Sequence, residues 1–152
     1  MGKRARDRYS LEPVLRLRRA ERDARAREVA GALATVRERE GDLEAALDAQ
    51  REAHDRVDET RRTMAESARA GGRGRDLDLH ARRIAFLESR AAAARSEVSS
   101  TRAVLDDARG ELENRRDALA RAISELKVVA NHRERWELER ARERERRQEE
   151  DP

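Results

Sequence analysis

The sequence predicts an all-α protein, a long two-helix antiparallel coiled-coil hairpin, and three observations lead to this. Charged residues make up 45% of the 152 residues and aromatic residues only 2%, so the chain lacks the apolar side chains that a compact core requires. Two long stretches repeat apolar residues at alternating steps of three and four, which is the spacing of a coiled-coil seam. The one cluster of glycines in the sequence lies between these two stretches.

Residues 1–9 are expected to form a basic N-terminal arm. Residues 1–27 hold ten basic and four acidic side chains, a surplus that suits an acidic protein surface or nucleic acid. The arm has no apolar run of the kind found in secretory signals. No stretch of the chain approaches the roughly 20 apolar residues of a membrane span. We therefore expect a soluble, cytoplasmic protein.

Residues 10–69 are predicted to form the first helix. Ser10 is a suitable N-cap, and Pro13 falls in the first turn, where its missing N–H group costs little. From residue 29 onward, eight of the twelve seam positions are apolar. The twelve positions are Val29, Leu33, Val36, Glu40, Leu43, Leu47, Gln50, His54, Val57, Arg61, Met64 and Ala68.

Residues 70–76 are predicted to be a glycine-rich turn, followed by a second helix over residues 77–148 with a charged C-terminal tail. Asp76 or Asp78 is expected to cap this helix. Thirteen of its sixteen seam positions are apolar, with no break in the repeat. They are Leu77, His80, Ile84, Leu87, Ala91, Ala94, Val98, Thr101, Leu105, Ala108, Leu112, Arg115, Leu119, Ala122, Leu126 and Val129.

A short turn between two matching seams predicts an antiparallel hairpin that is a monomer when free. If the turn is centred near Gly74, Leu43 of the first helix meets Leu105 of the second. The sequence gives no sign of enzymatic chemistry, since it has no cysteine and no phosphate-binding glycine motif or nucleophile constellation. Its three histidines are far apart along the predicted helices. We expect no metal, cofactor or small-molecule substrate.

Two stretches of the sequence resemble the FliJ/SctO (YscO) family, the stalk proteins of flagellar and virulence type III export machines. The opening "YSLEPVLRLRRAERDARAREVAGA" is similar to the start of the family. The stretch "LARAISELKVVANHRERWELERARERERRQEE" is similar to its C-terminal part, with a lysine, apolar residues, then His-x-x-x-Trp and a charged tail. The matching residues are Tyr9, Leu11, Val14, Leu15, Leu17, Arg18, Lys127, His132 and Trp136.

The resemblance implies a central stalk that couples a hexameric export ATPase to the export gate, at the inner membrane but peripheral to it. It implies that the end of the hairpin with both termini faces the ATPase. It also implies a distal patch that faces the cytoplasmic domain of the export-gate membrane protein, and possible escort of export chaperones. The ATPase-facing residues would be Arg16, Arg18, Arg19, Arg133, Arg135, Trp136 and Arg140, and the gate-facing residues Ala46, Gln50, Arg83, Phe86 and Leu87.

Several alternatives stay open from the residues alone. Trp136 either packs on Tyr9, Leu11 or Val14 and holds the hairpin together, or it anchors a partner, as aromatic residues often do. The whole chain is either a stalk, a basic helical nucleic-acid-binding protein, or a generic structural coiled coil that forms homodimers. Nucleic-acid binding is the less favoured of these, because acidic residues are interleaved with the basic ones and stacking aromatics are nearly absent.

Overall fold

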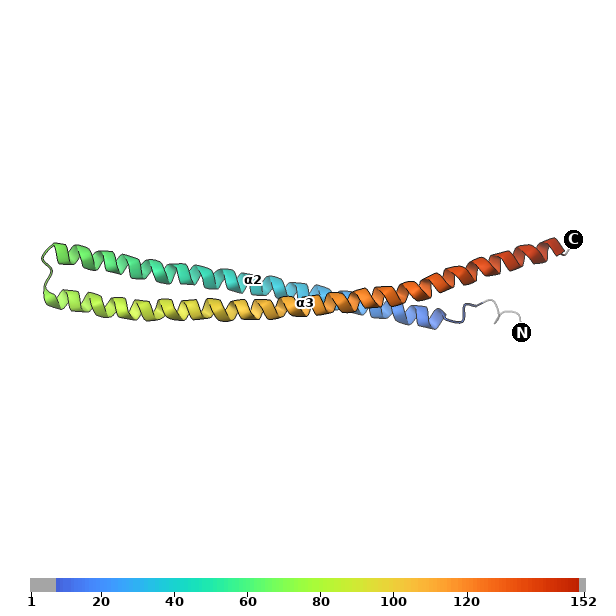
Figure 1. Cartoon of the computed structure of the whole chain (residues 1–152), viewed down its shortest axis with the longest axis horizontal. Coiled ribbons are helices and arrows are strands. Elements are labelled where there is room, and N and C mark those ends of the chain that lie inside the picture. The colour runs from blue at the N-terminus through green and yellow to red at the C-terminus, as the bar shows by residue number, and fades with distance from the viewer. Residues whose placement is uncertain (1–7, 151–152) are drawn as a thin grey trace. The chain divides into compact units, whose positions relative to one another are not determined.

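The structure is a computed structural model that describes residues 8–150. Helix α2 spans Glu12–Arg69 and helix α3 spans Gly74–Glu150, and the described residues contain no strand. The two helices run in opposite directions (Figure 1), which confirms the predicted all-α antiparallel hairpin. Most of the predicted arm, residues 1–7 with Lys3, Arg4 and Arg6, lies outside the described residues.

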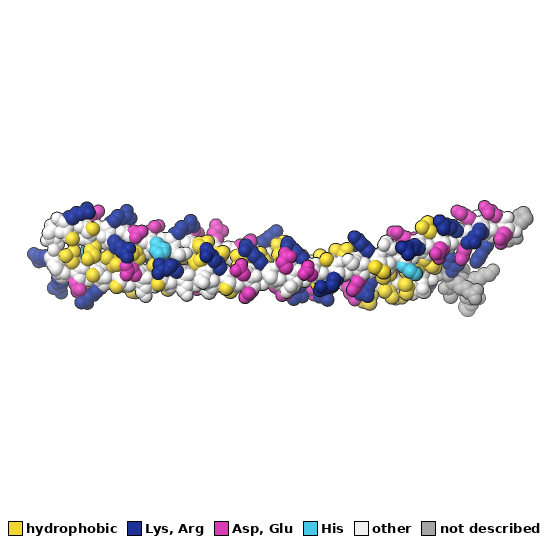
Figure 2. All heavy atoms as spheres, viewed as in Figure 1, with side chains coloured by type: hydrophobic (Ala, Val, Ile, Leu, Met, Phe, Trp, Pro, Cys, Tyr) yellow, Lys and Arg dark blue, Asp and Glu magenta, His cyan; other side chains and the backbone are white. Residues whose placement is uncertain are grey.

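The contacts divide the chain into two units, which we name by what each contains. The terminal unit comprises residues 1–33 and 111–152, and the turn unit comprises residues 34–110. Each unit consists of a segment of α2 packed along a segment of α3. In the face shown in Figure 2, acidic and basic side chains are spread over both helices, and hydrophobic side chains gather between the helices and also appear at the outer surface.

The seam predicted for the second helix is confirmed at every position. All sixteen of its side chains are buried or half-buried in α3. Leu105 is 3% exposed, Ala91 3% and Val98 5%. A repeat of three and four residues averages 3.5 per turn, which keeps one face of a helix toward its partner over a long distance.

The seam predicted for the first helix is right at alternate positions and displaced by one residue at the others. Val36 and Val57 are buried as expected. However, the structure buries Ala46 and Thr60 instead of the next residues, Leu47 and Arg61, of which Leu47 is half-buried and Arg61 exposed. Burial of the Thr60 hydroxyl is tolerated because it donates a hydrogen bond of 2.8 Å to the carbonyl of Arg56, which leaves no unpaired polar atom.

The helix boundaries at the turn also differ from the predicted ones. Gly71 has a positive φ of 81°, and the Gly72 N–H donates to the carbonyl of Ser67 at 2.8 Å. With the bond from the Gly71 N–H to the Ala68 carbonyl at 3.3 Å, this is a Schellman motif, which ends a helix by using glycine in the left-handed region. The turn is therefore complete by residue 73, and α3 begins at Gly74 instead of residue 77.

Arg73 occupies the N-cap position of α3, ahead of the predicted caps Asp76 and Asp78. The carbonyl of Arg73 accepts hydrogen bonds from the N–H groups of Asp76 at 2.9 Å and Leu77 at 3.2 Å. Asp76, one of the two predicted caps, lies inside the first turn, where its negative charge favours the positive end of the helix dipole. At the other terminus, α2 begins at Glu12 instead of Ser10, and the Glu12 N–H donates to the carbonyl of Tyr9 at 3.2 Å.

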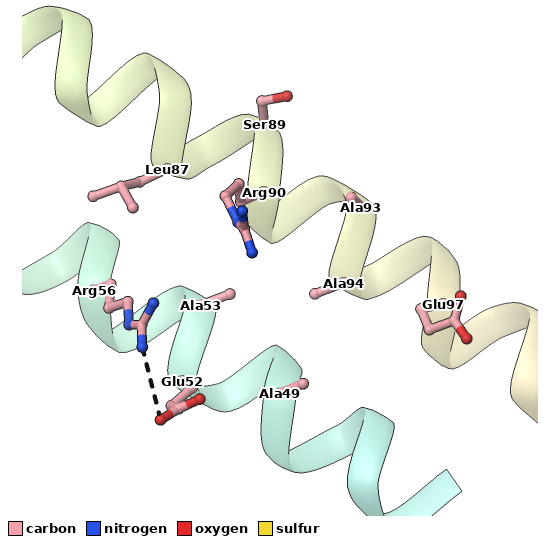
Figure 3. Close-up of a pocket in the computed structure, with 10 residues that line it drawn as sticks. All are labelled: Ala49, Glu52, Ala53, Arg56, Leu87, Ser89, Arg90, Ala93, Ala94 and Glu97. Carbon is pink, nitrogen blue, oxygen red and sulfur yellow. Dashed lines mark ion pairs between the residues drawn. The ribbon is translucent and has the colours of Figure 1, made fainter. Parts of the chain in front are cut away.

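The contacts of the turn unit bear on how its two helices face each other. The ion pairs of Arg61 with Glu88 and of Arg109 with Glu40 agree with the predicted pairing to within one residue. Asp42 shares a groove with Thr101 and Val104, and Ala53 shares one with Arg90 and Ala94 (Figure 3). Leu105 is buried and Leu43 is half-buried, and their shared layer stays a prediction.

The two glycines of the turn are expected to be costly to replace. Gly71→Ala forces a side chain into the left-handed region, and a Cβ on Gly72 would lie 2.8 Å from the Ser67 carbonyl oxygen. We expect each change to lower the free energy of unfolding by about 1–2 kcal/mol, measured by urea denaturation followed by circular dichroism. The control is Gly74→Ala, where a Cβ meets nothing within 4 Å. Equal midpoints for all three variants would contradict this account of the turn.

Candidate interaction surfaces

An aromatic cluster holds the terminal unit together where α2 begins. Tyr9 precedes α2 and is only 6% exposed. Its ring centroid lies 5.5 Å from that of Trp136 and 5.7 Å from that of His132, both on α3. The Tyr9 hydroxyl is 2.8 Å from His132 Nδ1 and 3.4 Å from the carbonyl of Val129. Tilted rings at these distances stabilise one another beyond simple burial.

The cluster accounts for the single tryptophan in a highly charged stretch. Trp136 follows Val129 by seven residues and so continues the seam of α3. One side of its indole packs on Tyr9, while the Arg140 guanidinium lies 5.6 Å from its ring centroid, a cation–π contact. Trp136 is half-buried. The structure thus supports the packing role, with Tyr9 as its partner, and leaves part of the indole accessible.

The predicted ATPase-facing arginines fall into two groups, and the first group is engaged within the chain. Arg133 contacts Glu12 at 3.1 Å and Glu137 at 3.0 Å. Arg16 lies 3.7 Å from Glu12, and Arg140 lies 3.3 Å from Glu143. These arginines form ion pairs with carboxylates of the same chain, so they are less available to a partner protein.

Arg18 belongs to the same engaged group and links the two helices. Its guanidinium lies 2.8 Å from Glu21 on α2 and also contacts Glu125 on α3. The hydrogen bond to Glu21, together with the charge of Glu125, raises the pKa of Arg18. Both carboxylates are about half exposed, and exposed pairs of this kind contribute little to stability because water screens them.

A second link between the helices joins Glu28 and Arg115. Their ion pair spans 3.2 Å. The hydrogen bond from Arg25 on the same helix lowers the pKa of Glu28, and Arg115 lowers it further. The hydrogen bond to Glu111, with an added contribution from Glu28, raises the pKa of Arg115. Sequence spacing alone could not predict this pair, because it depends on the register of the hairpin.

The second group consists of Arg19 and Arg135, which are exposed. Neither makes an ion pair with any residue between 8 and 150.

The end of α3 extends past the level of Glu12, where α2 begins (Figure 1). Residues 137–150 thus form a helix with no facing segment of α2, and alternating arginine and glutamate side chains let it persist in water.

The predicted gate-facing residues lie in the turn unit but do not form one surface. Leu87 lines the groove drawn in Figure 3, together with Arg90 and several alanines. Phe86 lies beside it, 59% exposed, with the Arg90 guanidinium 6.0 Å from its ring centroid. Gln50 lines a different groove with Arg95 and Val98. The structure brings Phe86 and Leu87 to neighbouring positions and places Gln50 elsewhere.

Ala46 is a correction to the predicted gate-facing set. Its side chain is 9% exposed and belongs to the core of the hairpin. The cause is the displacement of the α2 seam, which places Ala46 where Leu47 was expected. Arg83, the remaining member of the set, is exposed on α3.

The sequence analysis missed a second basic region at the turn. Residues 61–90 hold eight arginines and four acidic side chains, and most of these arginines are exposed. The acidic middle of the first helix outweighs this surplus in a charge count over the rest of the chain. A charge count over shorter windows would have found it. Two large exposed apolar side chains, Leu79 and Phe86, lie in the same region.

The described residues offer surfaces for binding. Residues 8–150 contain no group of three His, Asp or Glu side chains that could hold a metal ion. In the same part of the chain, no helix is long and apolar enough to cross a membrane. The surface of residues 8–150 presents exposed guanidinium groups, which bind carboxylates and phosphates, and a few exposed apolar side chains.

A family model described as "YscO-like protein" matches residues 6–152. Neither the curated proteins nor the solved structures give a match to this chain.

Proposed function

Because the chain belongs to the YscO-like family, we propose that it is the central stalk of a type III export ATPase complex. The family relates the chain to type III secretion. In the proposed role, the terminal unit binds a hexameric export ATPase and the turn unit contacts the cytoplasmic domain of the export-gate protein. Escort of export chaperones is a further part of the same proposal, and the complex lies in the cytoplasm against the inner membrane.

The observation that carries the proposal is the form of the terminal unit. It presents a single helix, residues 137–150, beyond a two-helix segment. A thin helical end of this kind suits insertion into the pore of a ring. The aromatic cluster stabilises the two-helix segment from inside, so that segment needs no partner to fold.

In the proposed role, exposed arginines of the terminal unit attract the export ATPase. Arg19 and Arg135 are exposed and unpaired among residues 8–150. Acidic loops lining the pore would attract them at long range, because complementary charge speeds encounter and sets orientation more than it adds affinity. Arginines that form ion pairs within the chain, such as Arg133, stabilise the helices and do not contact the ATPase directly.

The proposed contact with the export gate is limited to one side of the turn unit. Arg83 and Phe86 are exposed there, and Leu87 lines the adjoining groove. Aromatic and arginine side chains dominate the energetics of protein interfaces. Ala46 is left out of this surface because it is buried.

The test is a triple charge reversal at exposed arginines of the terminal unit. We choose Arg19→Glu, Arg135→Glu and Arg142→Glu. Arg133 and Arg140 are avoided, because their loss would also release Glu12 and uncover Trp136. We expect the affinity for a cognate hexameric export ATPase to fall about tenfold to a hundredfold, from about 0.2–1 kcal/mol for each exposed pair and the repulsion that replaces it.

The matched control reverses three exposed arginines of the turn unit, Arg37, Arg95 and Arg102, none of which forms an ion pair within residues 8–150. This variant should bind the ATPase as the wild type does. Helicity of both variants, from circular dichroism, should equal that of the wild type, and wild-type affinity should fall as salt rises. Equal ATPase binding by the two triple variants would remove the terminal unit from the proposed function.

A further inference from the structure

One face of α3 beside the turn has an unusual composition. Six residues lie on it at helical spacing and point away from the seam that packs on α2. We call this the outward face. It consists of Arg75, Leu79, Arg82, Arg83, Phe86 and Arg90. At 3.6 residues per turn these positions fall within about a third of the helix circumference, over a length of about 22 Å.

The apolar members of the outward face are more than half exposed to water. Leu79 and Phe86 are each 59% exposed, and they lie seven residues apart, two turns along the same side of the helix. Ile84 and Leu87, by contrast, turn toward α2 and are half-buried. Large exposed apolar side chains that recur on one helix face indicate a surface that something covers.

The charged members of the outward face are all arginine. Arg75 and Arg83 make no ion pair with any residue of the described range 8–150. Arg82 contacts Asp78 at 3.0 Å, but both side chains are more than half exposed, so this pair is weak. Arg90 leans over the Phe86 ring. Four guanidinium groups therefore surround two apolar side chains, and the face itself has no acidic member.

We infer that the outward face binds the surface of an anionic phospholipid bilayer. A helix that lies in a membrane interface has large apolar side chains along its centre and basic side chains at their flanks. Leu79 and Phe86 enter the boundary of the acyl chains. The arginines extend their stems along the same boundary and hold their charges at the lipid phosphates, which guanidinium groups bind through paired hydrogen bonds.

The chemistry of the face favours this occupant over two others. A nucleic-acid backbone would neutralise the arginines but would leave Leu79 and Phe86 without an apolar partner. An acidic protein segment would need a matching hollow for both side chains on its own surface. A fluid bilayer satisfies both requirements at once, because phosphates and apolar chains lie within the depth of one side chain. This inference goes beyond the proposed stalk function and does not rest on it.

The experiment measures partition onto vesicles by co-sedimentation. Vesicles of phosphatidylcholine with one third phosphatidylglycerol are compared with vesicles of phosphatidylcholine alone. The full-length protein should bind the first kind and not the second, and binding should weaken as salt rises. Removing three charges with Arg75→Gln, Arg82→Gln and Arg83→Gln should lower the partition coefficient by roughly fivefold for each arginine. Removing the apolar pair with Leu79→Ser and Phe86→Ser should lower it at least tenfold.

Matched controls exist in the same unit. Val104 is 46% exposed on α3, and Val104→Ser should leave partition unchanged, as should Arg37→Gln with Arg102→Gln. Insertion has its own readout, because the chain has no cysteine. Leu79→Cys labelled with an environment-sensitive fluorophore should shift to the blue on anionic vesicles, and Val104→Cys should not.

Several results would overturn the inference. Equal partition onto neutral vesicles would do so, as would wild-type partition of either multiple variant. Capture of an acidic peptide or random duplex DNA without any binding to vesicles would assign the face to one of the other occupants. Failure here is separable from failure of the proposed gate contact, because Arg75 and Leu79 belong only to the outward face, whereas Leu87 belongs only to the gate-facing surface.

Discussion

Replacing Leu105 with alanine is expected to lower the free energy of unfolding of the turn unit by about 2–4 kcal/mol. Leu105 is 3% exposed in the seam of α3, far from either end of the helix. A two-helix interface has no further layer that could move in to fill the space left by a lost isobutyl group. The measurement is urea denaturation of the full chain followed by circular dichroism.

The neighbouring residue provides the control. Val104 is also apolar and on α3, but it is 46% exposed. Val104→Ala should change the free energy of unfolding by less than about 0.5 kcal/mol, as surface substitutions usually do. Similar losses for the two variants would mean that the seam of α3 is not the face that packs on α2.

Replacing Tyr9 with alanine is expected to destabilise the terminal unit by about 3 kcal/mol, at the lower end of the range for buried aromatic side chains. Tyr9 is 6% exposed and contacts both Trp136 and His132. The value lies at the lower end because the residue is close to the end of α2, where fraying competes. The readout is fluorescence of Trp136, the only tryptophan in the chain, which reports on this unit alone.

Two further variants separate the contributions to this cluster. Tyr9→Phe keeps the ring and removes the hydroxyl that lies 2.8 Å from His132 Nδ1, so it should cost only about 1 kcal/mol. Leu11→Ala, at a side chain that is 37% exposed, should cost less still. If Leu11→Ala shifts the fluorescence transition as far as Tyr9→Ala does, the aromatic cluster is not what holds the unit together.

The second helix was predictable because its repeat keeps one register throughout. Thirteen of its sixteen seam positions from Leu77 to Val129 are apolar, with no break in the repeat. A regular repeat of this kind identifies both the helix and the buried side. Trp136 follows by simple extension of the same repeat.

The first helix was less predictable because adjacent positions compete for the seam. Ala46 and Leu47 are both apolar; the repeat predicts Leu47 for the seam, whereas the structure buries Ala46 and half-buries Leu47. The choice is made by the partner helix, through a register that depends on the turn. That register could not be read from the glycines alone, because three of them are close together and the conformation of Gly71 decides where α2 ends.

The candidate surfaces were predictable as residue types but not as arrangements. The sequence shows many arginines, but it does not show which of them are engaged. Arg133 and Arg19 both lie in arginine-rich stretches, yet one bridges two carboxylates and the other makes no ion pair among residues 8–150. Long-range pairs such as Arg18 with Glu125 exist only once the hairpin has closed.

The hairpin has a consequence for the order in which its contacts assemble. The links between the helices span 27 residues at Arg61 with Glu88 and 69 residues at Arg109 with Glu40. The span grows to 107 residues at Arg18 with Glu125 and to 123 at Tyr9 with His132. Closing a long loop costs more chain entropy than closing a short one, by about 0.6 kcal/mol for each doubling.

The glycine turn is therefore the natural starting point of folding, and the helices zip together from it. Each new pair closes only a small additional loop once the preceding pair has formed. By the same reasoning the terminal unit forms last and opens first, while contacts near the turn persist. The two helices thus separate most readily at the end that is proposed to meet the ATPase. At the opposite end the turn holds the helices together, and a ring that encloses the terminal unit would hold them together there.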